Sequence, residues 1–147
     1  MTHYRTILVG TDGSETSFDA VERAAELARD AQAALVIACA YFPEKPDTHD
    51  TDVLGDEAYQ VVGSTPAESS LRTARERASK TGAQQVDVRA IEGKPSPTLL
   101  AAAKDANADL IVVGNVGLNT LTGRLIGSVP QDVLRHSPVD VLVVHTT

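Results

Sequence analysis

The fold is decided by residues 108–128, ADLIVVGNVGLNTLTGRLIGS. Its opening part, residues 108–114, is an apolar run of strand length, the pattern of a parallel strand that helices cover on both faces. The rest is a long loop with the spacing G-x2-G-x9-G-S, formed by Gly114, Gly117, Gly127 and Ser128. A buried strand that runs into a glycine-rich loop predicts an α/β sheet with a ligand-binding loop at its carboxyl edge.

Outward from this strand, apolar runs alternate with helical patterns along the whole chain. Further strands are predicted from residue 6 to near Asp12 and at residues 34–41, 85–91 and 139–145. Helices are predicted at residues 17–31, 65–81, 98–107 and 129–136. Thr65 is the expected N-cap of the second helix, with Pro66 at its first helical position. This order forces parallel pairing through right-handed crossovers. The predicted fold is α/β: one domain over residues 1–147, an open, Rossmann-like, five-stranded parallel sheet with helices on both faces and the last strand at an edge.

The chain is acidic, with a net charge of −7 and a pI near 4.9. Nucleic acid and anionic membranes both require a basic surface, so neither is an expected partner. Residues 43–60 hold six acids against the single Lys45, which predicts a mobile acidic loop. A second hypothesis is that this loop gates the mouth of a pocket next to Tyr41. The single cysteine and the N-terminus without an apolar run favour a cytoplasmic location.

Two strand ends carry residues that could bind a ligand. The first is Gly10-Thr11-Asp12-Gly13, and the second is the loop from Gly114 to Ser128. Glycines let backbone N–H groups approach oxygen atoms, and the start of the following helix adds unpaired donors and a positive dipole end. Ser128 supplies a hydroxyl, and Arg124 is the one cation of the loop. An anion site is therefore predicted, although neither the P-loop nor the dinucleotide fingerprint follows any of these strands.

The chain resembles the universal stress proteins, specifically the branch that binds ATP through G-x2-G-x9-G-[ST]. Matching blocks stand in family order at residues 7–14, 108–114, 127–129 and 134–144. The resemblance implies an adenine nucleotide alpha hydrolase-like fold, with Asp12 near the ribose and backbone contacts to adenine around Ala40. It also implies phosphate contacts from Gly117, Gly127, Ser128 and Val129, and a homodimer that pairs the last strand with its copy.

The predicted nucleotide-binding residues are Gly10, Thr11, Asp12, Ala40, Gly114, Gly117, Arg124, Gly127, Ser128 and Val129. No catalytic residue and no metal ligand is assigned. The expected ligand is ATP, AMP or cyclic AMP, with Mg²⁺ only if ATP is bound. One departure from the family is at residue 130. The family often has Ser or Thr at this position, whereas this chain has Pro130, which has neither a hydroxyl nor a backbone N–H. We therefore expect a ligand with fewer phosphates, AMP or a cyclic form, to be tolerated or preferred over ATP.

Alternative interpretations stay open for several of these residues. Each glycine alone also fits a simple turn, and Asp12 followed by Gly13 is as good a turn former as a ribose acceptor. Ser128 with Gln131 also fits a capping box. Cys39, within an apolar strand, is predicted to be a small buried hydrophobe and not a nucleophile.

The leading functional hypothesis is a non-catalytic protein that senses or buffers an adenine nucleotide in stress or dormancy. The alternatives are a slow ATPase or phosphotransferase and a structural dimer module with an unoccupied pocket. Against an enzyme, the loop has no P-loop lysine, and the metal and the base stay unassigned.

Overall fold

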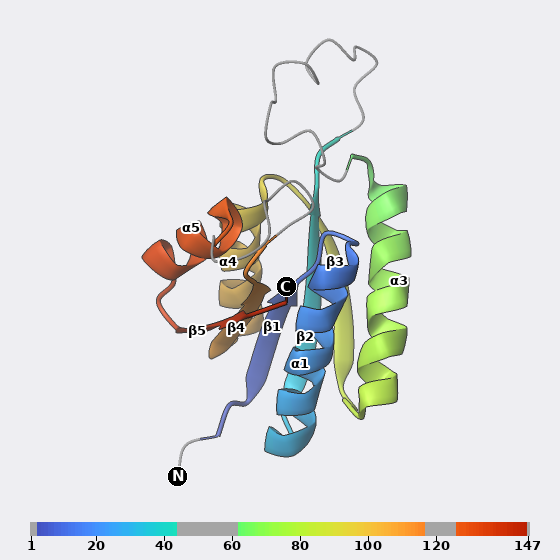
Figure 1. Cartoon of the computed structure of the whole chain (residues 1–147), viewed down its shortest axis with the longest axis vertical. Helices are drawn as coiled ribbons and strands as arrows, with labels where there is room; N and C mark the ends of the chain where they lie inside the picture. Colours follow the sequence, from blue (N-terminus) through green and yellow to red (C-terminus); the bar gives the residue numbers. More distant parts are fainter. Residues whose placement is uncertain (1–2, 44–61, 117–125, 147) are drawn as a thin grey trace.

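The computed structural model describes residues 3–43, 62–116 and 126–146, and its strands form one five-stranded sheet (Figure 1). The strands are β1 (Thr6–Gly10), β2 (Ala34–Tyr41), β3 (Val86–Glu92), β4 (Leu110–Gly114) and β5 (Asp140–Val144). The helices are α1 (Glu15–Ala31), α3 (Ser64–Thr81), α4 (Pro95–Ala106) and α5 (Ser128–His136). Every pairing is parallel, in the order β3-β2-β1-β4-β5. The predicted α/β class and the open parallel sheet are confirmed, and β5 lies at an edge as expected.

Helices cover both faces of the sheet, with α1 and α3 on one side and α4 and α5 on the other (Figure 1). Alternate residues of each strand enter two separate cores: Ile7 and Val9 pack with α1 and α3, whereas Leu8 packs on the α4 and α5 side. The helices contribute mostly alanine to these cores, for example Ala20, Ala24, Ala25, Ala67, Ala74, Ala78, Ala102 and Ala103. Small side chains let the helix backbones lie close to the sheet.

Strand order reverses between β1 and β4, and this reversal positions the candidate site. From β1 the chain builds outward through β2 to β3, then returns to place β4 on the other side of β1. Val9 is paired with Val112, so the carboxyl ends of β1 and β4 are neighbours. The connections that leave these two ends diverge to opposite sides, which is where open α/β sheets bind their ligands.

The start of α3 differs from the sequence expectation. Gly63, not Thr65, is the N-cap, and Thr65 lies inside the first turn. Gly63 has a φ of 86°, a conformation that glycine adopts without strain. Its N–H donates to the carbonyl of Phe42 at 2.6 Å, so a tertiary contact fixes where the helix begins.

The starts of α4 and β4 also differ from the prediction. The helix begins at Pro95, three residues earlier than predicted, because proline fits a first-turn position where no N–H is needed. β4 begins at Leu110 and not at residue 108. Asp109 instead uses its carboxylate to accept the N–H groups of Arg5 at 3.0 Å and Thr6 at 3.2 Å.

The predicted acidic loop, residues 43–60, lies outside the described residues except for Pro43. Among the helices of the described ranges, none has the length and apolar character that a membrane crossing requires.

Candidate functional site

The turn after β1 is held together by hydroxyl groups and by the Asp12 carboxylate. Thr11 Oγ1 lies 2.7 Å from Ser17 Oγ and accepts the Gly13 N–H at 3.1 Å. Asp12 Oδ1 accepts both the N–H of Ser14, at 2.9 Å, and its hydroxyl, at 2.5 Å. Ser14 is the N-cap of α1, because its Oγ accepts the Ser17 N–H at 3.2 Å. The turn is thus one hydrogen-bonded unit, and it starts α1 two residues earlier than the sequence predicted.

Packing or backbone conformation favours glycine at two positions of this turn. A Cβ on Gly10 would lie 2.8 and 2.9 Å from the two methyl carbons of Leu99 in α4. Gly13 has a φ of 85°, and a Cβ there would lie 2.5 Å from Ser70 Oγ in α3. The turn interpretation therefore holds for Gly13, while Gly10 lets α4 approach the end of β1.

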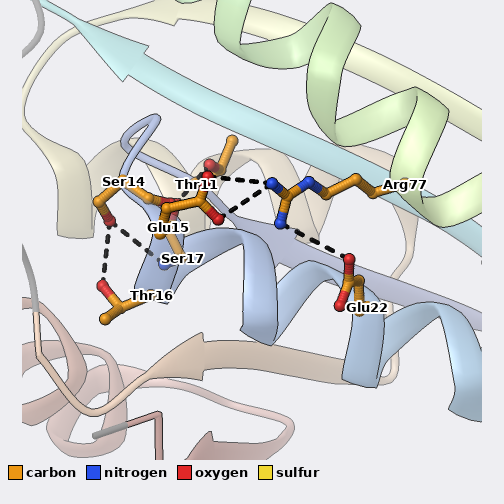
Figure 2. A network of polar contacts seen from close by, with 7 residues as sticks. All are labelled: Thr11, Ser14, Glu15, Thr16, Ser17, Glu22 and Arg77. Atoms are coloured by element: carbon orange, nitrogen blue, oxygen red, sulfur yellow. Dashed lines mark hydrogen bonds and ion pairs between the residues drawn. The ribbon is translucent and has the colours of Figure 1, made fainter.

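Arg77 connects α3 to the first turns of α1 (Figure 2). Its guanidinium lies 3.0 Å from a carboxylate oxygen of Glu15 and 3.6 Å from one of Glu22. The same group stacks over the Phe18 ring at 4.8 Å from the centroid. Surface ion pairs of this kind add little stability, so the cluster is a contact between α3 and the helix that Ser14 caps.

Asp12 places a negative charge near the carboxyl end of β2. Cys39 is fully buried there, and burial, with the Asp12 charge as a lesser cause, raises its pKa to about 12. The thiol is therefore protonated at neutral pH, in keeping with the predicted buried hydrophobe. Ser14 occupies one oxygen of the Asp12 carboxylate, and no hydrogen bond within the described ranges involves the other, Oδ2.

The backbone of Ala40 extends past the end of β1. β1 pairs with β2 as far as Ala38, whose carbonyl accepts the Thr11 N–H at 3.0 Å. On the opposite side, the Tyr41 carbonyl accepts the Gly93 N–H at 2.9 Å. Backbone groups of alternate residues in a strand point the same way, so those of Ala40 point toward the β1 side, beyond the last β1 pair. They are placed to meet a ligand at this edge.

Asn115, directly after β4, joins the loop start to two other segments. Its N–H donates to the Val144 carbonyl at 2.9 Å, and its carbonyl accepts the Gly127 N–H at 2.7 Å. Gly114 and Gly127 are therefore held at the same edge of the sheet. The sequence alone assigns no role to Asn115. The available signal was an amide side chain between Gly114 and Val116, directly after a buried strand.

The capping-box interpretation of Ser128 and Gln131 is wrong. Gly127 is the N-cap of α5, and no side chain caps this helix. Gln131 instead donates from its amide nitrogen to the Ile126 carbonyl at 2.6 Å. The Asn115 carbonyl accepts the Gly127 N–H and holds Gly127 at the N-cap position. Ser128 is therefore the first helical residue, and its hydroxyl has no capping role.

The first turn of α5 presents a short set of donors. The first N–H groups of a helix have no partner within the helix, and Ser128 and Val129 supply two of them. The third residue, Pro130, has no N–H. Ser128 is exposed and adds its hydroxyl. Two backbone donors, one hydroxyl and the positive end of the helix dipole thus form the anion-attracting part of the site.

The described part of the predicted site is gathered at the carboxyl edge of the sheet, on β1, β2, β4 and the start of α5: Gly10, Thr11, Asp12, Ala40, Gly114, Gly127, Ser128 and Val129. Gly117 and Arg124 lie outside the described residues. Within the described ranges, no group of three or more His, Cys, Asp or Glu side chains could hold a metal ion.

Comparison with known proteins identifies relatives over the whole chain. Residues 3–145 match the model of the Universal stress protein family. A universal stress protein of Mycobacterium tuberculosis is 51% identical over 147 residues, covering 100% of both chains. A putative universal stress protein of Staphylococcus aureus is 33% identical over 147 residues, covering 99% of this chain and 87% of the relative.

Solved structures agree with these sequence relatives. A universal stress protein in complex with cAMP is 42% identical, with a TM-score of 0.77 and coverage of 99% of this chain and 100% of the other. The universal stress protein UspA from Lactobacillus plantarum is 26% identical, with a TM-score of 0.79 and the same coverage. On the family match, the sequence identity and the shared fold, this chain belongs to the universal stress protein family.

Proposed function

We propose that this protein binds an adenine nucleotide without turning it over, at the edge of the sheet where β1 and β4 end. The observation that carries the proposal is the reversal of strand order, which brings the Asp12 turn, the Ala40 backbone and the start of α5 to one edge. The relative that is 42% identical was solved in complex with cAMP, which supports an adenine nucleotide as the ligand.

Each part of the nucleotide has a partner in this proposal. Asp12 Oδ2 accepts hydrogen bonds from the free ribose hydroxyls, which are two in AMP and the 2′-hydroxyl alone in cyclic AMP, since Ser14 already uses Oδ1. The N–H and C=O of Ala40 pair with the polar edge of adenine. The donors of Ser128 and Val129 hold phosphate oxygens. Gly117 and Arg124 remain predicted phosphate contacts outside the described residues.

The number of phosphates follows from the start of α5. Pro130 leaves the first turn one N–H short, so the site favours AMP or cyclic AMP over the longer phosphate chain of ATP. Mg²⁺ is then needed only when ATP is bound. Calorimetric titration with AMP, cyclic AMP and ATP measures the three affinities directly. A clear preference for ATP with Mg²⁺ would refute this assignment.

A sensing or buffering role is proposed because the described residues offer ligand contacts but no assigned base or nucleophile. Native mass spectrometry of the purified protein is expected to find a co-purified adenine nucleotide. The comparison variant is Ser128→Ala. It removes one donor from the site and should lower the fraction of protein that carries nucleotide. ATP hydrolysis that is lost in Ser128→Ala would instead favour the slow ATPase.

We also infer a homodimer that pairs β5 with its copy. β5 forms one edge of the sheet, and its central residues, Val141, Leu142 and Val143, are only half-buried in the single chain. A strand edge with apolar side chains is a template for pairing with another strand. A copy of the same strand would cover these valines and leucine and remove the open edge.

A further inference from the structure

Asn115 is a buried polar residue to which the proposed function assigns no ligand contact. It is 5% exposed, and both of its backbone groups are paired with other segments. Its carbonyl holds Gly127, the N-cap of α5, and its N–H is bound to Val144 at the end of β5. One residue therefore ties the end of β4 to the start of α5 and to the end of the edge strand.

The side chain of Asn115 is held by the segment that follows β5. Its Oδ1 accepts two hydrogen bonds from Thr146, one from the N–H at 2.9 Å and one from the hydroxyl at 3.0 Å. Its Nδ2 lies 3.4 Å from His145 Nδ1. Thr146 also covers Gly114, because a Cβ added there would lie 3.6 Å from Thr146 Cγ2. A buried amide that lost these partners would carry a desolvation cost, so the contacts restrict the Asn115 side chain.

We propose that Asn115 is a positioning residue for the nucleotide site and that Thr146 is the partner that keeps it in place. This inference rests on the proposed function. The Thr146 bonds fix the Asn115 side chain and with it the orientation of its backbone carbonyl. That carbonyl holds the Gly127 N–H, and Gly127 sets where the donors of Ser128 and Val129 point. Thr146 thus acts on nucleotide affinity without touching the nucleotide.

Thr146→Val is the sharpest variant, because it keeps the shape of the side chain and the backbone bond but removes the hydroxyl bond to Asn115. Thr146→Ser keeps a hydroxyl at this position and loses only the methyl group. The matched control is Thr81→Val at the far end of α3, which also loses one threonine hydroxyl bond, to the Arg77 carbonyl at 2.8 Å. A chain that ends at Val144 removes both Thr146 bonds and the His145 contact with the Asn115 amide, and it serves as the stronger perturbation.

Two quantities are measured on the wild-type protein, on each substitution and on the shortened chain: the Kd for AMP and for cyclic AMP by calorimetry, and the amide hydrogen exchange rate of Gly127 without ligand. Thr146→Val is expected to weaken nucleotide binding by about twofold to tenfold and to speed Gly127 exchange by a similar factor. Thr146→Ser should match the wild type. The chain ending at Val144 should lose more affinity than Thr146→Val. Thr81→Val should lower the stability to unfolding and change neither quantity.

The proposal is overturned if Thr146→Val or the shortened chain keeps wild-type affinity and wild-type exchange at Gly127. It is also overturned if Thr81→Val loses as much affinity, since the effect would then be general destabilisation. Failure of the wild-type protein to bind AMP, cyclic AMP or ATP would refute the proposed function instead. In that case Gly127 exchange in unliganded Thr146→Val still decides the positioning role: faster exchange supports it and unchanged exchange refutes it.

Discussion

Replacing Pro130 with serine tests which nucleotide this site is suited to hold. Pro130 is the third residue of α5, where any other residue would present an N–H without a partner in the helix. Pro130→Ser supplies that N–H and a hydroxyl, and Pro130→Ala supplies the N–H alone. Both additions extend the set of phosphate donors, so both variants should gain affinity for ATP relative to AMP.

The expected size follows from the donors added. A hydrogen bond to a charged group contributes about 1.5–3 kcal/mol. The lower end applies here, because the neighbouring Ser128 is exposed and water competes for the phosphate. Since about 1.4 kcal/mol is a factor of ten, the ratio of the AMP Kd to the ATP Kd should rise about tenfold in Pro130→Ala, which adds one donor, and by more in Pro130→Ser, which adds two.

A stability cost accompanies this gain and cancels in the ratio. Pro130 is buried, and its replacement loses apolar contact and frees the unfolded chain, at a cost of about 1 kcal/mol. This cost acts on the protein whichever nucleotide is added. The ratio of two dissociation constants, each from calorimetry of the same preparation, therefore isolates the effect of the donors.

The control is Pro138→Ala, an exposed proline that follows α5 and should leave the ratio at its wild-type value. Wild-type ratios in both Pro130 variants would refute the argument that the missing N–H limits the phosphate chain. So would a wild-type protein that already binds ATP with Mg²⁺ more tightly than AMP.

Three further predictions concern the packing, the buried thiol and the dimer. Gly10→Ala should lower the free energy of unfolding by about 1–3 kcal/mol, because the new Cβ meets the buried Leu99 methyls at 2.8 and 2.9 Å; an unchanged denaturant midpoint would contradict this. Burial raises the Cys39 pKa from 9.0 to about 12, so between these values the folded state keeps a proton that the unfolded chain releases, and stability falls as the pH rises. Cys39→Ala should show a smaller fall over the same window, and an identical pH dependence would count against the raised pKa. Sedimentation equilibrium should give twice the 15.5 kDa chain mass, whereas a chain-sized mass at every soluble concentration would exclude the β5 pairing.

The inner strands could be predicted closely because their apolar runs are bounded by turn residues. The predicted range 34–41 coincides with β2, and β1 begins at Thr6 as predicted but ends at Gly10, before the predicted end near Asp12. The strand that begins with Ala108 was predicted too long, because Asp109 uses its carboxylate on the backbone of the neighbouring segment. That contact joins residues far apart in the chain and leaves no local pattern.

Helix starts were predicted less well, for a shared physical reason. Thr65 and Ser128 both begin good capping sequences, yet a glycine is the N-cap in each case. Gly63 donates its N–H to Phe42 beyond β2, and Gly127 donates its N–H to Asn115 beyond β4. Local capping preference is worth about 1 kcal/mol, and a tertiary backbone contact at a strand end can outweigh it. The contacts between Asn115 and Thr146 could not be predicted from the sequence either, because they depend on the register in which β4 pairs with β5.

An acidic chain can hold an anionic ligand at this site because the described hydrogen-bond donors are neutral groups that act only at short range. The net charge of −7 acts at long range, where salt screens it over about 8 Å. The N–H groups of Ser128 and Val129 act at hydrogen-bond distance and at the positive end of a helix dipole. A polyanion such as nucleic acid would be repelled by the whole negative surface. A small nucleotide would interact mainly with the donors at the start of α5. Each added phosphate increases the repulsion from Asp12 without gaining a donor from Pro130, so both the charge and the missing N–H predict a preference for the shorter ligand.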